Sequence, residues 1–466
     1  MSNKKLWRPL ALLMAFGLMA AACGGDDEAE TTDTTAVEAG SDTTAAEDAG
    51  TDTTAADDGA MEEDEVVAID TVEAAPTCTG ESDGVLKIGG ILPETGNLAF
   101  LGPPEFAGAQ LAADDINAAG GVLDADVEWL PGDSGDNGDV ANQTVDRLLS
   151  DNVDAFLGAA SSGVSFTVID KITAACKIQF SPANTSPDFT TKDPNELYFR
   201  TAPSDVLQGR VLADLIVEEG SGTAVLMALQ DPYGEGLLKF TKEPLEAQGV
   251  EVLDDFVYDP KAASFDAEVE KVVASGAEAV VVIGFDETAQ ILTGLFEAGI
   301  TPETNSIYLV DGNIGNALGE KFTEAGVLAG IKGTLPAAEI SADFKDRLLG
   351  VDPDLIDFSY GPETYDAFVI MALAAEAAGT DDPAEIAKRI NGITGGGEKC
   401  TTFADCKELI AAGTDIDYDG PSGPQAFSQA GEPTEASFAI LSYAEDANTI
   451  DETKTVYKFA KIDGES

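Results

Sequence analysis

The feature that most constrains the fold is an alternation of short apolar runs with helical patterns, which starts near residue 85 and continues through most of the chain. Residues 85–92 form an apolar run typical of a buried strand. Pro103-Pro104 then opens a helical pattern that Gly120-Gly121 ends. Because strands and helices take turns, the sequence predicts an α/β fold, in which helices cover a parallel sheet.

The alternation falls into two series. The first has strand patterns at 127–130, 155–157 and 177–180, with helical stretches at 140–150 and 165–175. The second follows residue 204, with helical patterns at 205–219 and from 264, and strand patterns at 224–229, 250–258, 279–283 and 307–310. We expect the chain to cross back near 333–336, so that a long helix at 362–378 joins the first series. Two α/β lobes are therefore expected.

The N-terminus has the layout of a signal peptide over residues 1–22. Lys4, Lys5 and Arg8 precede an uncharged apolar run at 9–22 that ends in small residues. This run of 14 residues is short for a permanent anchor, since a spanning helix needs roughly 20. We therefore expect the leader to be cleaved.

The segment around Cys23 resembles the lipobox of bacterial lipoproteins. Residues 20–25 read Ala-Ala-Ala-Cys-Gly-Gly, and in such proteins the cysteine thiol receives a diacylglyceryl group before cleavage. The resemblance implies that Cys23 becomes a lipidated N-terminus on the outer face of the cell membrane. Ala20 stands where Leu is commonest, so plain secretion after an A-x-A cut is the alternative.

Residues 23–76 are expected to form a disordered acidic stalk behind the lipid. Asp, Glu, Thr, Ala and Gly dominate the segment, and Asp-Thr-Thr-Ala recurs at Asp33, Asp42 and Asp52. Such a segment has too little apolar surface to repay the entropy of folding, and its like charges repel. Cation or basic-partner binding by the acidic run is the alternative.

The charge balance excludes several partners. The chain has 25 Lys and Arg against 86 Asp and Glu, a formal net charge of −61, and the stalk supplies only part of this excess. Binding to nucleic acid or anionic lipid depends on Lys and Arg, so neither is expected as a partner.

Four cysteines besides Cys23 allow three pairings. Cys400 and Cys406 can close a small loop, which leaves Cys78 to pair with Cys176, and we favour this arrangement. Zinc is a weak alternative, because the chain has no histidine and the spacing is not that of a four-cysteine zinc site.

Several segments together resemble the branched-chain amino acid and amide binding proteins of ABC transporters, which have the type I periplasmic-binding-protein fold. The resemblance runs over 86–462. Each piece is short, but their order and spacing are specific. The pieces are 91–96 (Ile-Leu-Pro-Glu-Thr-Gly), 109–117 with its Gly-Gly end, 160–163 (Ala-Ser-Ser-Gly), 181–187 (Ser-Pro-Ala-Asn-Thr-Ser-Pro), 199–205 (Phe-Arg-Thr-Ala-Pro-Ser-Asp), 233–236 (Tyr-Gly-Glu-Gly) and 365–367 (Tyr-Asp-Ala).

The resemblance implies two lobes joined by three hinge crossings, which close on a small ligand. We expect the first lobe at 84–201 plus 336–436 and the second at 202–335 plus 437–464. It also implies an amino acid of branched-chain type or an amide as ligand, the membrane permease of an ABC importer as partner, and a monomer. No cofactor is expected.

The resemblance places the ligand's α-carboxylate at two loops of the first lobe, at Ser161 and Ser162 and at Asn184 and Thr185. A helix N-terminus offers unpaired N–H groups, so it can bind an anion without Lys or Arg. The alternative is that these residues only cap helices and form turns.

The second lobe is expected to supply Asp311, after the strand at 307–310, for the α-amino group, unless Asp311 is only a helix cap. Phe100, Tyr233 and Phe285, on loops after strands, resemble the family's pocket wall. Ordinary packing between the lobes is their alternative.

Two acidic segments imitate calcium loops. Residues 415–420 begin like an EF-hand loop, but Ala426 stands where a bidentate Glu is required. Residues 133–139 are interpreted as a strand-to-helix loop. No metal is expected.

Three functions compete. An importer's binding component is favoured over a ligand sensor, because the sequence has no spanning-helix pattern after residue 22. The hypothesis of a hydrolase is weak, because a chain without histidine has no Ser-His or Cys-His pair. The chain is therefore expected not to be an enzyme.

Overall fold

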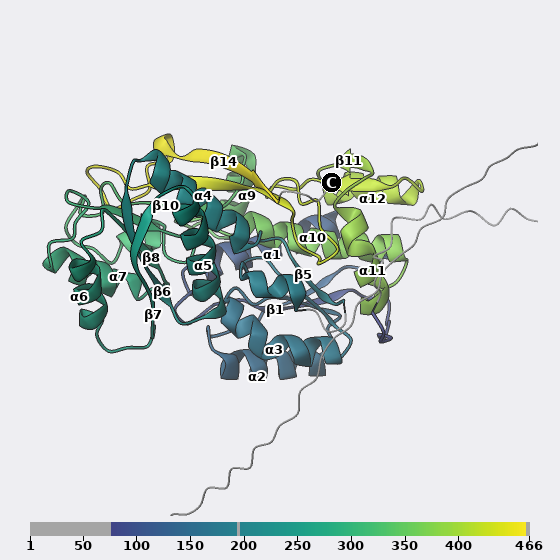
Figure 1. Ribbon diagram of the computed structural model, residues 1–466. Helices are drawn as coiled ribbons and strands as arrows, with labels where there is room; N and C mark the ends of the chain where they lie inside the picture. Colours follow the sequence, from purple (N-terminus) through teal and green to yellow (C-terminus); the bar gives the residue numbers. More distant parts are fainter. Residues whose placement is uncertain (1–75, 193–195, 463–466) are drawn as a thin grey trace, which may run out of the picture. The chain divides into compact units, whose positions relative to one another are not determined.

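The computed structural model describes residues 76–192 and 196–462 (Figure 1). The expected signal peptide, lipidated Cys23 and the stalk up to residue 75 lie outside the described residues, so they stay predictions. Within the described part, no helix combines the length and the apolar character that crossing a membrane requires.

The first half of the fold is built on a five-stranded sheet whose paired strands all run parallel, in the order β2-β1-β3-β4-β5. Every residue of β3 and β4 is buried, which explains their uninterrupted apolar runs. Helices α2 and α3 pack against each other, as Figure 1 shows, and share an apolar cluster with β3. The bounds are β1 (Lys87–Ile91), α1 (Gly102–Ala118), β2 (Glu128–Leu130), α2 (Gly138–Ser150), β3 (Ala155–Gly158), α3 (Ser162–Ala174), β4 (Ile178–Ser181), η1 (Pro187–Thr191) and β5 (Tyr198–Arg200).

The second half has a seven-stranded sheet in the order β14-β13-β10-β9-β8-β6-β7. Strand β8 has the predicted bounds and is buried throughout, as its Ala-Val-Val-Val-Ile sequence requires. The bounds are α4 (Asp205–Glu218), β6 (Thr223–Leu229), α5 (Pro232–Ala247), β7 (Glu251–Tyr258), α6 (Asp266–Ser275), β8 (Ala279–Ile283), α7 (Thr288–Glu297), β9 (Ser306–Leu309), α8 (Asn316–Gly319), β10 (Lys332–Pro336), β13 (Glu435–Ser442), η2 (Glu452–Lys454) and β14 (Val456–Lys461).

The sheet of this second half is not purely parallel, contrary to expectation. Strand β13 pairs antiparallel with β10, and β14 pairs antiparallel with β13. Both strands come from the C-terminal part of the chain, where the sequence analysis proposed no strand. Antiparallel pairing needs no crossover helix, so the alternation of strand and helix gives no signal for it.

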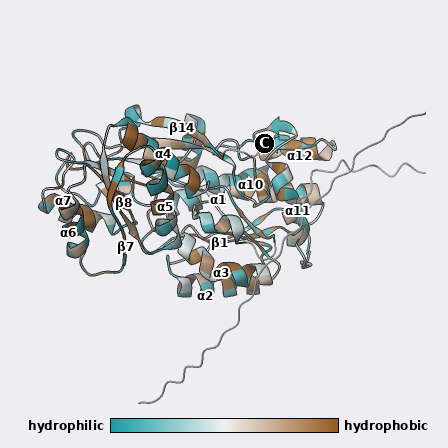
Figure 2. Ribbon diagram, in the orientation of Figure 1, coloured by the Kyte–Doolittle hydropathy of each residue, from teal (hydrophilic) through white to brown (hydrophobic). Residues whose placement is uncertain are grey.

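The remaining helices complete the first half. Helix α10 is buried along almost its whole length, where it packs on α1 and α11, which explains why it is apolar all round. In Figure 2 the outer helices α3, α6 and α7 instead change colour between apolar and polar around their axes. The bounds are α9 (Ala342–Val351), α10 (Gly361–Ala378), α11 (Pro383–Ile393), β11 (Glu398–Cys400), α12 (Phe403–Ala411) and β12 (Ile416–Tyr418).

Both favoured disulfides are present. Cys78 is bonded to Cys176 and Cys400 to Cys406, so the predicted pairing is confirmed. In the described residues no cluster of His, Cys, Asp and Glu could hold a metal ion. The segment that imitates an EF-hand instead contains β12, and its Asp417 and Asp419 pair with Lys399.

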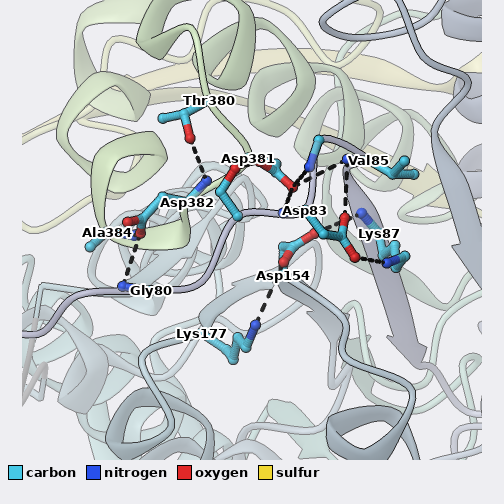
Figure 3. Close-up of polar contacts among 12 residues, drawn as sticks. Gly80, Asp83, Val85, Lys87, Asp154, Lys177, Thr380, Asp381, Asp382 and Ala384 are labelled. Carbon is cyan, nitrogen blue, oxygen red and sulfur yellow. Dashed lines mark hydrogen bonds and ion pairs between the residues drawn. The ribbon is translucent and has the colours of Figure 1, made fainter.

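A carboxylate ties the start of the described chain to the segment before α11 (Figure 3). Asp381 accepts hydrogen bonds from the Ser82 hydroxyl and from the N–H groups of Asp83, at 2.9 Å, and Gly84, at 2.8 Å. Burial raises the pKa of Asp381, but these donors outweigh it, and the net pKa is lowered. The ionised form is therefore the one that the fold stabilises.

Asp381→Asn is expected to lower the free energy of unfolding at pH 7 by about 1–3 kcal/mol, because a neutral amide accepts these bonds more weakly. A carboxylate with a lowered pKa contributes stability above its ordinary pKa of about 4 and loses it as the pH falls through the lowered value. The difference between the variant and the native chain should therefore shrink at pH 3. Urea denaturation measures it, with Asp346→Asn on the exposed side of α9 as the control. An equal loss at both pH values would contradict this role.

Candidate functional site

The loop after β3 carries the two predicted serines, both of them buried. Ser161 is the N-cap of α3, and its hydroxyl accepts a hydrogen bond from the Val164 N–H at 3.2 Å. Ser162 is the first helical residue rather than a residue before the helix. The capping alternative thus describes Ser161 in this structure, while both residues border the helix N-terminus.

The loop after β4 is fastened to the β3 loop by Asn184. Its side-chain amide donates to the carbonyls of Ala159, at 3.0 Å, and Ala160, at 2.8 Å, and accepts from the Tyr198 hydroxyl. The side-chain amide of Asn184 is therefore bonded to protein groups, and these bonds hold the two loops together. The neighbouring Thr185 is buried, and its hydroxyl lies against the carboxylate of Asp205 and favours the ionised form of that group.

A buried arginine holds the main chain of the loop after β4. Arg200, on β5, is paired with Glu432 and donates to the main-chain carbonyls of Asn184, at 3.0 Å, and Ser186, at 2.8 Å. Its guanidinium also lies over the Phe189 ring. The sequence analysis quoted Arg200 in a motif but gave it no role, because its partner Glu432 lies 232 residues away.

Asp311 lies just after β9, as predicted, and is a meeting point for both halves. Its carboxylate accepts from the Tyr233 hydroxyl at 2.8 Å and the Gln208 amide at 2.7 Å, and its second oxygen accepts from the Tyr360 hydroxyl at 2.7 Å. Tyr360 is the N-cap residue of α10, in the first half. Burial raises the pKa of Asp311, and these three donors oppose the effect. Asp311 is therefore not a helix cap but a buried polar centre.

A second carboxylate belongs to the same region. Asp205 is the first residue of α4 and is fully buried, and the Thr185 hydroxyl lies against its carboxylate. Burial and the charge of Asp311 raise its pKa well above the ordinary range. Gln208, one turn further along α4, donates to Asp311, so the helix presents Asp205 on the side that faces this centre.

Two of the predicted aromatic residues line one cavity. Phe100 and Phe285 belong to the wall of a cavity of about 420 Å³ that receives residues from the segment around α1 and from the loops after β8 and β9. Tyr233 stacks on Phe285 with ring centroids 5.6 Å apart. It lies in the first turn of α5 rather than on a loop, because Asp231 caps that helix and Pro232 starts it.

Carboxylates also surround the N-terminus of α3. Asp231 lies against the backbone of Gly163, and Asp136 receives a hydrogen bond from Ser161. Burial, followed by the charge of Asp231, raises the pKa of Asp136 to about 7. The cavity wall itself includes the acidic residues Asp286, Glu320, Asp354 and Asp357.

The site can bind and orient a small molecule, and its buried acceptors suit a ligand that donates hydrogen bonds. The cavity lies between two α/β halves, an arrangement typical of ligand-binding proteins. Its wall includes neither Asp311 nor the predicted loop residues Ser161, Ser162, Asn184 and Thr185. The sequence profile of the family described as "Periplasmic binding protein" matches residues 85–448. The chain belongs to this family, and its Leu/Ile/Val-binding-protein-like relatives confirm the type I resemblance.

Two curated relatives illustrate the range of the family. A protein of Pseudomonas aeruginosa named "Amino acid binding protein" is 30% identical over 322 residues, which cover 66% of this chain and 82% of the relative. The chemotactic substrate-binding protein BasB of Halobacterium salinarum is 24% identical over 377 residues, which cover 75% of this chain and 84% of the relative. The family's members are periplasmic solute-binding proteins and not enzymes.

Solved structures share the fold. The branched-chain amino acid transporter substrate-binding protein LivJ of Streptococcus pneumoniae, in complex with isoleucine, has a TM-score of 0.67 at 22% identity and covers 81% of this chain and 100% of its own. A solute-binding protein of an ABC transporter from R. palustris, in complex with benzoate, has a TM-score of 0.63 at 18% identity and covers 82% and 98%. At these identities the likeness shows the fold alone.

Proposed function

We propose that this chain is an extracytoplasmic, lipid-anchored solute-binding protein that captures an amino acid of branched-chain type, or an amide, and delivers it to an ABC importer. The observation that carries the proposal is the convergence of both halves on Asp311. Tyr360 of the first half and Tyr233 and Gln208 of the second all donate to one buried carboxylate. A ligand beside this centre would touch both halves and could stabilise their closed arrangement.

In this proposal the two halves are the lobes expected from the sequence, 84–201 plus 336–436 and 202–335 plus 437–464, joined by three crossings. Asp311 binds the ligand's amino group. The carboxylate, where the ligand has one, binds at the loops of Ser161, Ser162, Asn184 and Thr185. Phe100, Tyr233 and Phe285 enclose the rest. The protein acts as a monomer and delivers the ligand to the permease.

The experiment that tests the ligand class is mass spectrometry of small molecules released when the purified protein is denatured. An amino acid or amide is expected. A molecule whose only charged group is a carboxylate, such as benzoate, would contradict the ligand class and leave solute binding intact.

The second candidate is a ligand sensor, which the relative of Halobacterium named as chemotactic favours. Uptake of the radiolabelled ligand by cells with and without the gene separates the two functions. Transport predicts that uptake falls in the deletion strain, whereas a sensor would leave uptake unchanged and abolish the behavioural response.

Cys23→Ser is expected to move the protein from the membrane fraction to the medium, because it removes the thiol that would carry the diacylglyceryl group. Two acyl chains anchor a protein stably, whereas the stalk alone has no affinity for the bilayer. Cell fractionation measures the change, with Cys78→Ser as a control that keeps Cys23. A native chain that is already found in the medium would favour plain secretion instead.

A further inference from the structure

The first turn of α5, in the second half of the fold, lies against two segments of the first half. The Ser186 hydroxyl, in the loop after β4, donates to the main-chain carbonyl of Pro232 at 3.1 Å. Gly236 approaches η1 so closely that a Cβ atom on it would lie 2.7 Å from Cδ of Pro187. The two halves therefore meet at this turn without room for an additional side-chain carbon.

Asp231 bonds across the boundary between the halves. Its Oδ1 accepts a hydrogen bond from the Tyr233 N–H at 2.9 Å, which caps α5 itself. The carboxylate also accepts from the N–H of Gly163, in the first turn of α3 in the other half. Burial raises the pKa of Asp231, and these two N–H donors oppose the effect. One carboxylate thus caps two helices that belong to different halves.

The residue at position 163 has to be a glycine for this bond to form. A Cβ atom on Gly163 would overlap Oδ2 of Asp231 and would lie 3.1 Å from its Cγ. The backbone at Gly163 is helical, so α3 itself does not need a glycine there, and glycine is a poor helix former. The approach of Asp231 from the other half therefore explains the glycine.

Given the proposed solute-binding function, on which the inference rests, we propose that Asp231 is a positioning residue for closure. Its bond to Gly163 forms when the halves close, and it raises the closed population and with it the affinity for the solute. The N–H groups of a first helical turn have no acceptor within the helix, so opening the halves exposes that of Gly163 to water. A carboxylate is attracted to the positive end of the helix dipole, which makes the bond stronger than one between neutral groups.

This closure contact, the hydrogen bond from Gly163 to Asp231, has a defined effect on binding. A solute that touches both halves binds the closed form, so its apparent affinity falls with the closed fraction of the empty protein. Loss of a hydrogen bond to a charged group lowers the ratio of closed to open protein about tenfold or more. The effect does not depend on which solute binds, because Asp231 acts through the helix of the other half.

Hydrogen–deuterium exchange of the full chain, resolved to the Gly163 amide by fragmentation mass spectrometry, tests the closure contact without any solute. Asp231→Ser is the variant, because a serine still caps α5 but is too short to reach Gly163. We expect its Gly163 amide to exchange about fivefold faster or more than in the native chain. The control is Asp382→Ser, since Asp382 also caps a helix that begins with proline, α11, and accepts from a second N–H, that of Gly80 at 3.1 Å, within the first half. This control should leave exchange at Gly163 unchanged.

Calorimetric titration with L-isoleucine measures the consequence for binding. Asp231→Ser and Gly163→Ala should each weaken isoleucine about tenfold or more. Gly163→Ala keeps the carboxylate and favours the helix, so it provides the test if Asp231→Ser fails to fold. Gly350→Ala, at a position in α9 with open space around it, is the matched control and should bind as the native chain does. In the double variant Gly163→Ala should cause no further loss, because the shorter serine leaves room for the methyl group.

Unchanged exchange at Gly163 in Asp231→Ser would overturn the inference, as would additive losses of affinity in the double variant. Equal acceleration by Asp382→Ser would also overturn it, because the effect would then be one of general stability. If isoleucine does not bind to the native chain, the proposed ligand class is rejected, and the exchange rates alone then confirm or overturn the closure contact.

Discussion

Arg200→Met is expected to lower the free energy of unfolding by about 3–5 kcal/mol, because it leaves the carboxylate of Glu432 buried and unpaired. The side chain of Arg200 is fully buried, so solvent does not weaken the ion pair that the substitution removes. The loss also releases the carbonyls of Asn184 and Ser186. Ligand affinity should therefore fall with stability, since these bonds shape the loop that carries Thr185. Urea denaturation and calorimetric titration measure the two effects.

The double variant Arg200→Met with Glu432→Leu separates the unpaired charge from the lost loop bonds. Replacing both partners of a buried pair with apolar residues is often nearly neutral for stability. We expect it to recover most of the stability but little of the ligand affinity, because the carbonyls of the loop stay without their donor. A single variant that is as stable as the native chain would contradict the role of Arg200.

Asp311→Ala is expected to weaken binding of an amino acid more than tenfold, because it removes a buried charge that pairs with the ammonium. The substitution also leaves the hydroxyls of Tyr233 and Tyr360 and the amide of Gln208 without their acceptor. Calorimetric titration measures the loss. An unchanged affinity would remove Asp311 from the site.

The control for Asp311→Ala is Asp366→Ala, on α10. Asp366 is also fully buried and accepts a hydrogen bond from a tyrosine hydroxyl, that of Tyr418, at 2.7 Å, as well as one from the Ser422 N–H at 2.8 Å. The two variants should destabilise the fold to a similar extent. Since Asp366 bonds to Tyr418 of β12 and to Ser422 after it, and not to the Asp311 centre, its loss should change ligand affinity less than threefold.

The parallel parts of the fold could be predicted because burial on both faces produces continuous apolar runs. Strand β8 is the clearest case, since each of its residues is buried and its predicted and observed bounds agree. Strand β14 could not be found in this way. Its side chains are mostly exposed at the edge of the sheet, and Val456 and Phe459 remain more than half exposed, so its sequence carries no burial pattern.

The position of a candidate site residue was predictable where that residue follows a strand, and its contacts were not predictable where they come from distant parts of the chain. Asp311 was expected because it follows a strand and resembles the family's acidic position there, at the edge where α/β sheets bind ligands. Tyr360, in contrast, meets Asp311 from another half of the fold and has a left-handed backbone, with φ 60°, that no sequence pattern indicated. Asp205 was quoted within a motif, but only the structure shows that it is fully buried and close enough to Asp311 for the two charges to interact.

The central claim is that the solute binds between the two halves, at Asp311. A crystal structure grown with the solute that mass spectrometry identifies tests it most directly. The account predicts the solute's nitrogen within hydrogen-bond distance of Asp311, and its remainder against Phe100 or Phe285. A solute that binds elsewhere and contacts neither Asp311 nor the loops of Ser161 and Thr185 would contradict the account.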